Sequence, residues 1–146
     1  CFPGGKGRKV TAADFKYCYE RVCDPRAKTR GLWVYRDKVE GAEEFAAAPD
    51  KVNGISGFIA QDDSTFIIKL VQPFAPFLSI LTMPYGYVYP REAVEMYKDD
   101  FGFRIIGTGP YKFVKWDVEH KAKHELTPYN ITTRHGCLSS RPPILG

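Results

Sequence analysis

The first clear pattern in the sequence is an apolar stripe at helical spacing. Its members recur every three or four positions: Phe15, Cys18, Tyr19 and Val22. Before the stripe, Thr11 is suited to cap the free N–H groups of a first turn, and Asp14, three residues on, can return the interaction. After it, Asp24-Pro25 stops the pattern, because a proline disfavours helix at the preceding residue. A capped helix is therefore predicted between Thr11 and Asp24.

Alternating apolar and polar positions predict two β-hairpins. Residues 52–60 and 65–71 read as strands around the short turn 61–64. Later, the Gly107-Thr108-Gly109-Pro110 turn feeds a strand in which Tyr111 and Phe113 face opposite to Lys112. This strand, 110–116, is expected to pair with residues 119–126.

Short helices are predicted between these strands. Residues 39–48 are rich in alanine and glutamate and end at Pro49. Residues 77–83 form an apolar segment bracketed by prolines, expected to be a short buried helix. Residues 91–97 follow Pro90, which suits a first helical turn, and residues 98–106 read as a loop.

Tyr85, Tyr87 and Tyr89 alternate as in a short extended piece. The last sixteen residues, 131–146, show no clear period and are interpreted as an irregular tail.

Composition supports a folded chain with a core of its own. The 146 residues are 44% hydrophobic and 14% aromatic, which argues against disorder. The net charge is 21 − 17 = +4, and the positive charges are scattered rather than clustered, so no nucleic-acid partner is expected.

No apolar run reaches the length of a membrane span, and the opening at Cys1 shows no signal-peptide pattern. We interpret this opening as that of a fragment or a processed product.

The four cysteines leave the pairing open. Cys18 and Cys23 are five residues apart on one predicted helix and on different faces, so a bridge between them is not expected. Bridges from Cys1 to Cys23 or from Cys1 to Cys137 remain alternatives.

Most candidate chemistries have a simpler structural explanation. Gly4-Gly5-Lys6-Gly7 lacks the spacing of a phosphate loop. His120 and His124 would stand about 13 Å apart on a strand, too far for one metal ion, and His135 and Cys137 do not change this expectation of no metal. Aromatic residues next to lysine in 111–113 resemble an RNA-binding strand, but the lysine faces away from the rings.

A small hydrolase with a Cys or Ser nucleophile is the alternative function. Cys18 lies on the apolar stripe, where a core position explains it, and Asp62-Asp63 is explained by a turn. No Gly-x-Ser-x-Gly elbow is present.

The remaining candidates are aromatic residues for a ligand cleft, since tyrosine and tryptophan combine apolar area with a polar tip. The core explains most of them, but we expect Trp33, Tyr35 and Tyr85 to be the ligand-binding residues.

Four motifs in order resemble the family 5 extracellular solute-binding proteins, the oligopeptide-, dipeptide- and nickel-type receptors of ABC importers. They are Val10–Pro25, the Asp62-Asp63-Ser64-Thr65-Phe66 hairpin within Gly54–Leu70, Pro73–Leu78, and Gly107–Phe113. The resemblance covers about residues 9–130. It departs at Thr127-Pro128-Tyr129-Asn130, where the family usually has Asn-Pro-x-Tyr-Trp.

The resemblance implies an α+β chain with short helices and antiparallel hairpins, part of a two-lobed periplasmic-binding-protein-like type II α/β fold. Residues 1–106 would be an accessory subdomain of the first lobe, 107–130 a strand pair returning to that lobe, and 131–146 the irregular tail. Thr108 and Gly109 would shape the lobe connection.

The function that the resemblance implies is capture of a peptide or similar small solute by a non-enzymatic, monomeric receptor without a cofactor. The receptor would be periplasmic or extracellular and would deliver its solute to a membrane ABC permease. A lipid anchor on the full-length protein is an option that the resemblance leaves open.

Overall fold

The computed structural model describes residues 7–103 and 106 in full, and the backbone of 111–117, 121–126, 129–131 and 138–140. The chain divides into two compact units. One is Val10–Arg91, and the other contains the described residues on either side of it. The fold is mixed α+β, with short helices and antiparallel hairpins.

Helix α1, Ala12–Cys23, is the element around which the Val10–Arg91 unit packs. The Thr11 N–H donates to the Asp14 carboxylate at 2.8 Å, as the capping pattern predicts. Asp24 leaves the helix with an extended backbone before the short 3₁₀ turn η2, Pro25–Ala27. The predicted helix is confirmed at both ends.

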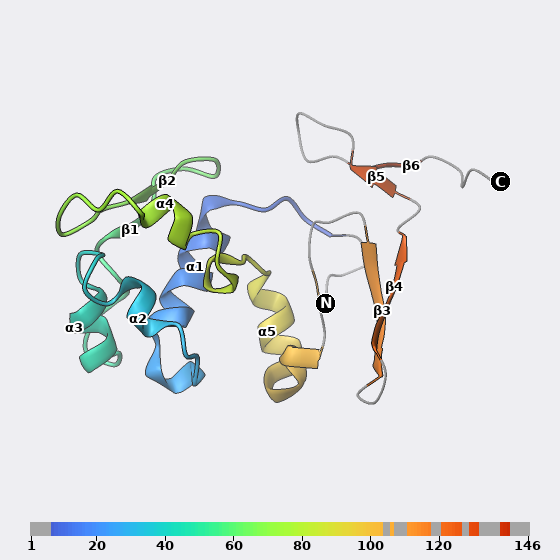
Figure 1. The fold of residues 1–146 in the computed structure, drawn as a ribbon, viewed down its shortest axis with the longest axis horizontal. Helices are drawn as coiled ribbons and strands as arrows, with labels where there is room; N and C mark the ends of the chain where they lie inside the picture. The colour runs from blue at the N-terminus through green and yellow to red at the C-terminus, as the bar shows by residue number, and fades with distance from the viewer. Residues whose placement is uncertain are drawn as a thin grey trace. The chain divides into compact units, whose positions relative to one another are not determined.

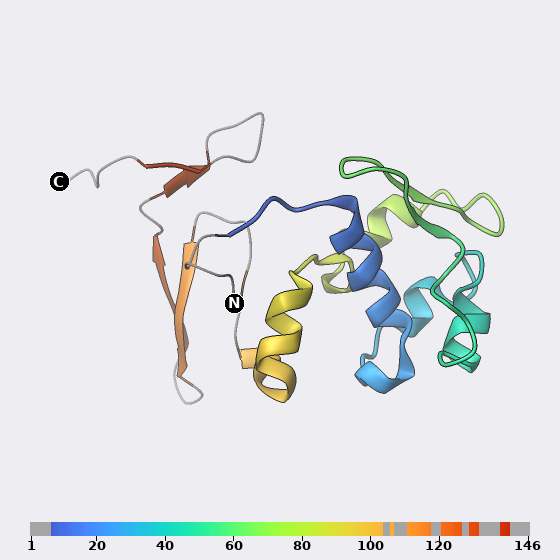
Figure 2. The same ribbon diagram turned by 180° about the vertical axis from the view of Figure 1, so that it is seen from behind.

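The other elements of this unit surround α1 (Figures 1 and 2). They are the helices α2 (Leu32–Tyr35), α3 (Ala42–Ala47) and α4 (Phe77–Ile80), the strands β1 (Phe58–Ala60) and β2 (Phe66–Ile68), and the 3₁₀ turn η3 (Pro84–Gly86). Both strands, α2, α3, η2 and η3 contact α1. The stripe predicted on α1 is thus the inner face of the unit.

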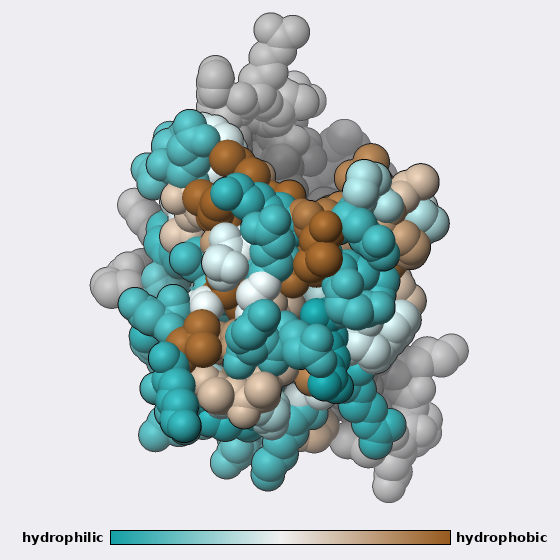
Figure 3. All heavy atoms as spheres, turned by 90° about the vertical axis from the view of Figure 1, so that its left-hand side faces the viewer, coloured by the Kyte–Doolittle hydropathy of each residue, from teal (hydrophilic) through white to brown (hydrophobic). Residues whose placement is uncertain are grey.

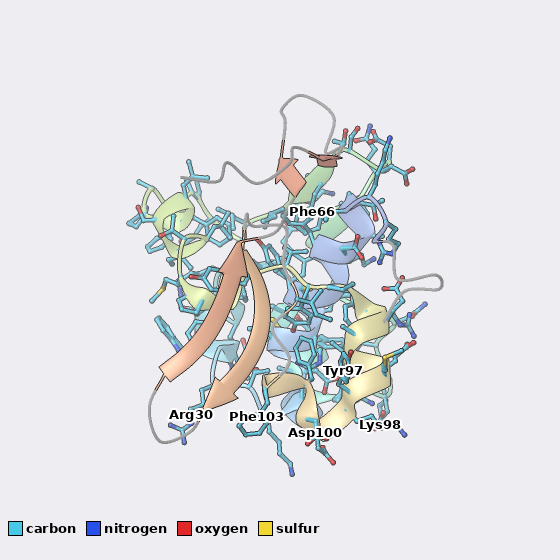
Figure 4. The ribbon with its side chains drawn as sticks, turned by 90° about the vertical axis from the view of Figure 1, so that its right-hand side faces the viewer. Arg30, Phe66, Tyr97, Lys98, Asp100 and Phe103 are labelled. Atoms are coloured by element: carbon cyan, nitrogen blue, oxygen red, sulfur yellow. The ribbon has the colours of Figure 1, made fainter. Side chains whose placement is uncertain are left out.

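The core beside α1 is aromatic. The Tyr19 ring stacks on Tyr35 with a centroid distance of 5.4 Å and meets Phe58 edge to face at 5.6 Å. Phe66, next to α1 in Figure 4, lies 5.6 Å from Tyr19 and 5.9 Å from Phe15. Aromatic pairs at such distances and tilts contribute beyond their buried area.

The first hairpin forms as predicted, but with shorter strands. β1 and β2 pair antiparallel, with Phe58 opposite Ile68. Residues 52–57 are not a strand, because Gly54 adopts φ = 83° and breaks the extended path. Gly57 lies very close to the backbone of two other segments. A Cβ atom added to Gly57 would lie 2.8 Å from the Glu40 carbonyl oxygen and 2.9 Å from the Lys69 carbonyl oxygen.

Three predictions for short elements are corrected. The helix expected over 39–48 begins only at Ala42, because Gly41 takes φ = 77°. The segment 77–83 is helical only over Phe77–Ile80, and it is not a buried helix, since Leu78 is 77% exposed and only Phe77 is buried. Tyr85 is not in an extended piece, because Pro84 starts the η3 turn that contains it.

The sequence predicted, residue for residue, the helix in which the Val10–Arg91 unit ends and the second unit resumes at Glu92. Helix α5 spans Arg91–Tyr97. The following Lys98–Phe103, expected as loop, forms the 3₁₀ segment η4, which carries Asp100 and Phe103 (Figure 4). Arg8 donates two hydrogen bonds to the Glu92 carboxylate, at 2.6 and 2.9 Å.

Two hairpins follow in this unit. Strands β3, Tyr111–Asp117, and β4, Lys121–Leu126, pair antiparallel as predicted, with a register shift between Phe113 and Lys115. Strands β5, Tyr129–Ile131, and β6, Leu138–Ser140, also pair. Residues 131 and 138–140 are thus extended, whereas the sequence predicted an irregular tail over 131–146; the rest of that tail lies outside the described residues.

Candidate ligand-binding site

Trp33 projects outward from a short helix whose other residues face the core. Its neighbours on α2, Val34 and Tyr35, are fully buried, while Trp33 is 55% exposed. Within one helical turn, residues at adjacent positions point about 100° apart, so a helix anchored by residues 34 and 35 directs residue 33 away from the core. The exposed indole is therefore available for contact.

Tyr85 meets Trp33 across the surface. The two ring centroids lie 6.2 Å apart at an interplanar angle of 82°, an edge-to-face arrangement. Half-buried Tyr85 reaches this place because Gly31 has no side chain. A Cβ atom on Gly31 would stand 2.5 Å from Tyr85 Cδ1 and 2.6 Å from Val22 Cγ1.

Tyr35 lies beneath this pair, inside the core. Its side chain has no exposed surface, and burial raises the pKa of its phenol. Its hydroxyl donates to the backbone carbonyl of Tyr85 at 3.2 Å. The structure thus brings all three predicted residues together, but it places only Trp33 and Tyr85 where a solute can touch them.

Two further residues, Lys38 and Phe74, lie near Trp33, and the sequence analysis did not select them. The Lys38 ammonium donates to the Trp33 carbonyl at 3.4 Å and stands 5.7 Å from the centre of the Phe74 ring. Lys38 also pairs with Asp37 at 2.7 Å. Phe74 belongs to the proline–aromatic motif that the sequence showed, whereas no sequence signal distinguishes Lys38 from other lysines.

The surface near Phe74 is unusually apolar for an exposed loop. Val71 is 63% exposed, Phe74 37% and Leu78 77%. Figure 3 shows apolar residues among hydrophilic ones on the face that carries α3 and the loop before α4. An aromatic pair beside such a surface suits a ligand with apolar side chains.

The two described thiols are core groups. Cys18 and Cys23 are free and have no exposed surface. Burial raises the pKa of Cys18 to about 11 and that of Cys23 to about 12, so neither is a thiolate at neutral pH. Cys23 therefore forms no bridge here, and neither thiol fits the nucleophile of the hydrolase alternative. The Cys1–Cys137 alternative lies outside the described residues.

The other candidate groups either have a role in local structure or lie outside the described residues. Asp62 accepts hydrogen bonds from the Ser64 N–H and hydroxyl and from the Thr65 N–H at 2.7–2.8 Å, which is the predicted turn. No group of three potential metal ligands occurs among the described residues. The described part of the chain also contains no helix that is long and apolar enough to cross a membrane. Thr108 and Gly109 lie outside the described residues, as do the side chains of the three histidines.

Sequence comparison gives a consistent set of relatives. The periplasmic oligopeptide-binding protein OppA of Salmonella typhimurium is 29% identical over 125 residues, which cover 84% of this chain and 23% of OppA. The dipeptide-binding protein of Lactococcus lactis is 30% identical over 111 residues, covering 73% of this chain and 20% of that protein. The glutathione-binding protein GsiB of Pectobacterium atrosepticum is 32% identical over 128 residues, covering 84% and 21%.

Solved structures show the same likeness. An oligopeptide-binding protein of Borrelia burgdorferi superposes with a TM-score of 0.73 at 23% identity, covering 82% of this chain and 24% of that one. Haemophilus influenzae OppA, in complex with the peptide RPPGFSPFR, gives a TM-score of 0.71 at 27% identity, covering 84% and 24%. The chain thus spans between a fifth and a quarter of the length of these relatives.

The family described as "Bacterial extracellular solute-binding proteins, family 5 Middle" matches residues 6–129, most of the chain. The four motifs recognised in the sequence all lie inside that match. This chain belongs to the family 5 bacterial extracellular solute-binding proteins.

Proposed function

We propose that this chain is part of the substrate-binding component of an ABC importer, which captures peptides or similar small solutes outside the cytoplasm. The relatives with sequence similarity are named for binding oligopeptides, a dipeptide or glutathione. One solved relative holds a nonapeptide. All of these are peptides or peptide-like molecules, and all of these relatives are binding proteins rather than enzymes.

The single observation that carries the site is the exposed Trp33 set edge-on against Tyr85. Trp33 is 55% exposed, so its indole has apolar area available for a ligand. The carbonyl of Trp33 is already held by Lys38, so the indole ring, rather than the local backbone, is the group left to contact a solute. Trp33 and Tyr85 form the contact surface in this proposal.

The mechanism that fits such a receptor is closure of two lobes around the solute. A ligand that contacts both lobes binds the closed state better than the open one and so shifts the equilibrium toward closure. The closed, monomeric receptor would then meet a membrane permease, in the periplasm or at the cell surface. This chain would supply one wall of the cleft.

The test is a calorimetric titration with a mixed pool of di- to pentapeptides. The complete receptor, expressed from the reading frame that contains this chain, is expected to bind. The 146-residue chain alone is expected to bind weakly or not at all, since one wall of a cleft buries less than half of a ligand. Micromolar binding by the isolated chain would contradict this division of the site.

Replacing the indole tests the site itself. In the complete receptor, Trp33→Ala is expected to weaken peptide binding about tenfold, or about 1.4 kcal/mol. The matched control is Tyr87→Ala, which removes an aromatic residue that is 63% exposed and lies outside the Trp33–Tyr85 ring pair. Unchanged affinity in Trp33→Ala, or equal losses in both variants, would remove Trp33 from the site.

A further inference from the structure

The segment Met83–Tyr89, which we call the strap, carries Tyr85. Its own backbone bonds are few: the Gly86 N–H donates to the Met83 carbonyl at 2.8 Å and the Tyr87 N–H to that of Pro84 at 3.3 Å. Within the described residues, the strap pairs with no strand. The Met83 N–H donates to the Ile80 carbonyl at 3.0 Å, which ties the start of the strap to the end of α4. Beyond this bond, the strap is positioned by contacts from side chains of other elements.

These contacts come from α1 and α2. The Tyr35 hydroxyl donates to the Tyr85 carbonyl at 3.2 Å, and the Tyr19 hydroxyl to the Gly86 carbonyl at 3.4 Å. At the end of the strap, the Cys18 thiol donates to the Tyr89 carbonyl and accepts from its N–H, both at 3.2 Å. Tyr35 is thus the donor that acts on residue 85 itself.

The Tyr35 hydroxyl is held rigidly in place. The ring is stacked on Tyr19 and meets Phe58 edge to face at a centroid distance of 5.6 Å and an angle of 86°. With no exposed surface, the ring has no room for another rotamer. A donor fixed in this way fixes the carbonyl that accepts from it.

We propose that Tyr35 is a positioning residue for the ligand site. Its hydroxyl holds the Tyr85 backbone in the position from which the Tyr85 ring packs against Gly31 and contacts Trp33. The inference rests on the proposed function, in which Trp33 and Tyr85 contact the solute. Tyr35 itself never touches the solute. It acts through residue 85, whereas the sequence analysis expected it to bind the ligand directly.

The first test reads the free protein and needs no ligand. The chain has two tryptophans, Trp33 and Trp116, so Trp116→Phe leaves Trp33 as the reporter. In this background, Tyr85→Ala removes the ring contact completely and gives the upper reference value for the acrylamide quenching constant of Trp33. Tyr35→Phe is expected to raise this constant by at least half of the difference between the Trp116→Phe protein and the Tyr85→Ala variant. Tyr87→Phe, which removes an exposed hydroxyl from the same strap, is the matched control and should leave it unchanged.

The second test reads binding by the complete receptor. Tyr35→Phe is expected to weaken peptide binding three- to tenfold. In a Tyr85→Ala background it is expected to have no further effect, because Tyr35 acts on the site only through the Tyr85 ring. A merely structural role would lower affinity equally in both backgrounds.

The outcomes separate the two claims. Unchanged Trp33 quenching in Tyr35→Phe overturns the positioning role, whatever the affinities are. An additive loss in the double variant overturns it as well. If Trp33→Ala leaves affinity unchanged while Tyr35→Phe still alters quenching, the proposed site fails but Tyr35 does position Tyr85.

Discussion

Two buried thiols on α1 make the stability of this chain sensitive to alkaline pH. Burial raises the pKa of Cys18 from 9.0 to about 11 and that of Cys23 from 9.0 to about 12. A group with a raised folded pKa contributes stability that is fully present below its unfolded pKa and is lost as the pH rises through its folded pKa. The folded chain is therefore expected to lose stability between about pH 9 and pH 12.

Urea unfolding at pH 8, 9.5 and 10.5 measures this loss. Cys18→Ser is the informative variant, because a serine hydroxyl can keep the bonds to Tyr89 but does not ionise in this range. Its stability is expected to fall less steeply than that of the unaltered chain. A parallel decline in both proteins would show that ionisation of Cys18 plays no part.

Residue by residue, the sequence locates aromatic clusters better than it assigns their roles. Trp33 and Tyr35 are two positions apart and chemically alike, yet one is 55% exposed and the other has no exposed surface. Their difference depends on which face of a four-residue helix meets α1, and so short a helix has no periodicity to read. Lys38 was missed for the related reason that its contact with Trp33 is to a backbone carbonyl.

At the scale of elements, the β1–β2 hairpin depends on one carboxylate in its turn. Hydrogen bonds from the Ser64 hydroxyl and N–H, and from Thr65, lower the pKa of Asp62 to about 2. The neighbouring Asp63 carbonyl accepts from the Ala12 N–H at 2.9 Å, so the turn also meets the start of α1. Loss of the Asp62 carboxylate should loosen both elements.

Asp62→Ala is expected to lower the free energy of unfolding, because it removes a side chain that satisfies two backbone N–H groups of the turn. Chemical denaturation at pH 7 measures it. Asp63→Ala serves as the control, because it removes the adjacent carboxylate and leaves the three hydrogen bonds of the Asp62 turn in place. Equal effects of the two substitutions would assign the loss to charge rather than to the turn.

Elements with strong local signals match their predictions, and those set by close packing do not. Helix α5 follows a proline and spans the predicted Arg91–Tyr97, and α1 has its cap and its stop. Residues 52–57 have the sequence pattern of a strand, but Gly57 packs closely against the backbone of Glu40 and Lys69. Such contacts between distant parts of the chain leave no local pattern.

At the scale of the whole molecule, Val10–Arg91 forms a compact unit with its own core. The chain from Val10 to Arg91 is therefore expected to fold alone. Its only tryptophan is Trp33, so its fluorescence and urea unfolding curve should match those of the 146-residue chain that carries Trp116→Phe.

A shorter chain ending at Ile80 is the comparison. It lacks the strap and hence the contacts of Tyr35 and Cys18 with it, and it should unfold at lower urea concentration. If Val10–Arg91 proves unfolded by far-ultraviolet circular dichroism, then the unit depends on the residues that flank it.

The sequence motifs predicted the family and the α+β class, and both are confirmed. The proposed boundaries at residues 106 and 130 remain predictions. Boundaries are harder to predict because they depend on which contacts cross between segments, and the contacts that define the Val10–Arg91 unit join α1 to residues some seventy positions away.

The bonds between Arg8 and Glu92 have a consequence for how the Val10–Arg91 unit can be accommodated by a host protein. Arg8 lies just before the unit and Glu92 just after it, so their hydrogen bonds at 2.6 and 2.9 Å join the chain segments that enter and leave it. A module whose two ends meet can be spliced into a surface loop of another domain at a single point. The host then closes only a short gap, at little entropic cost, and both can keep their own cores.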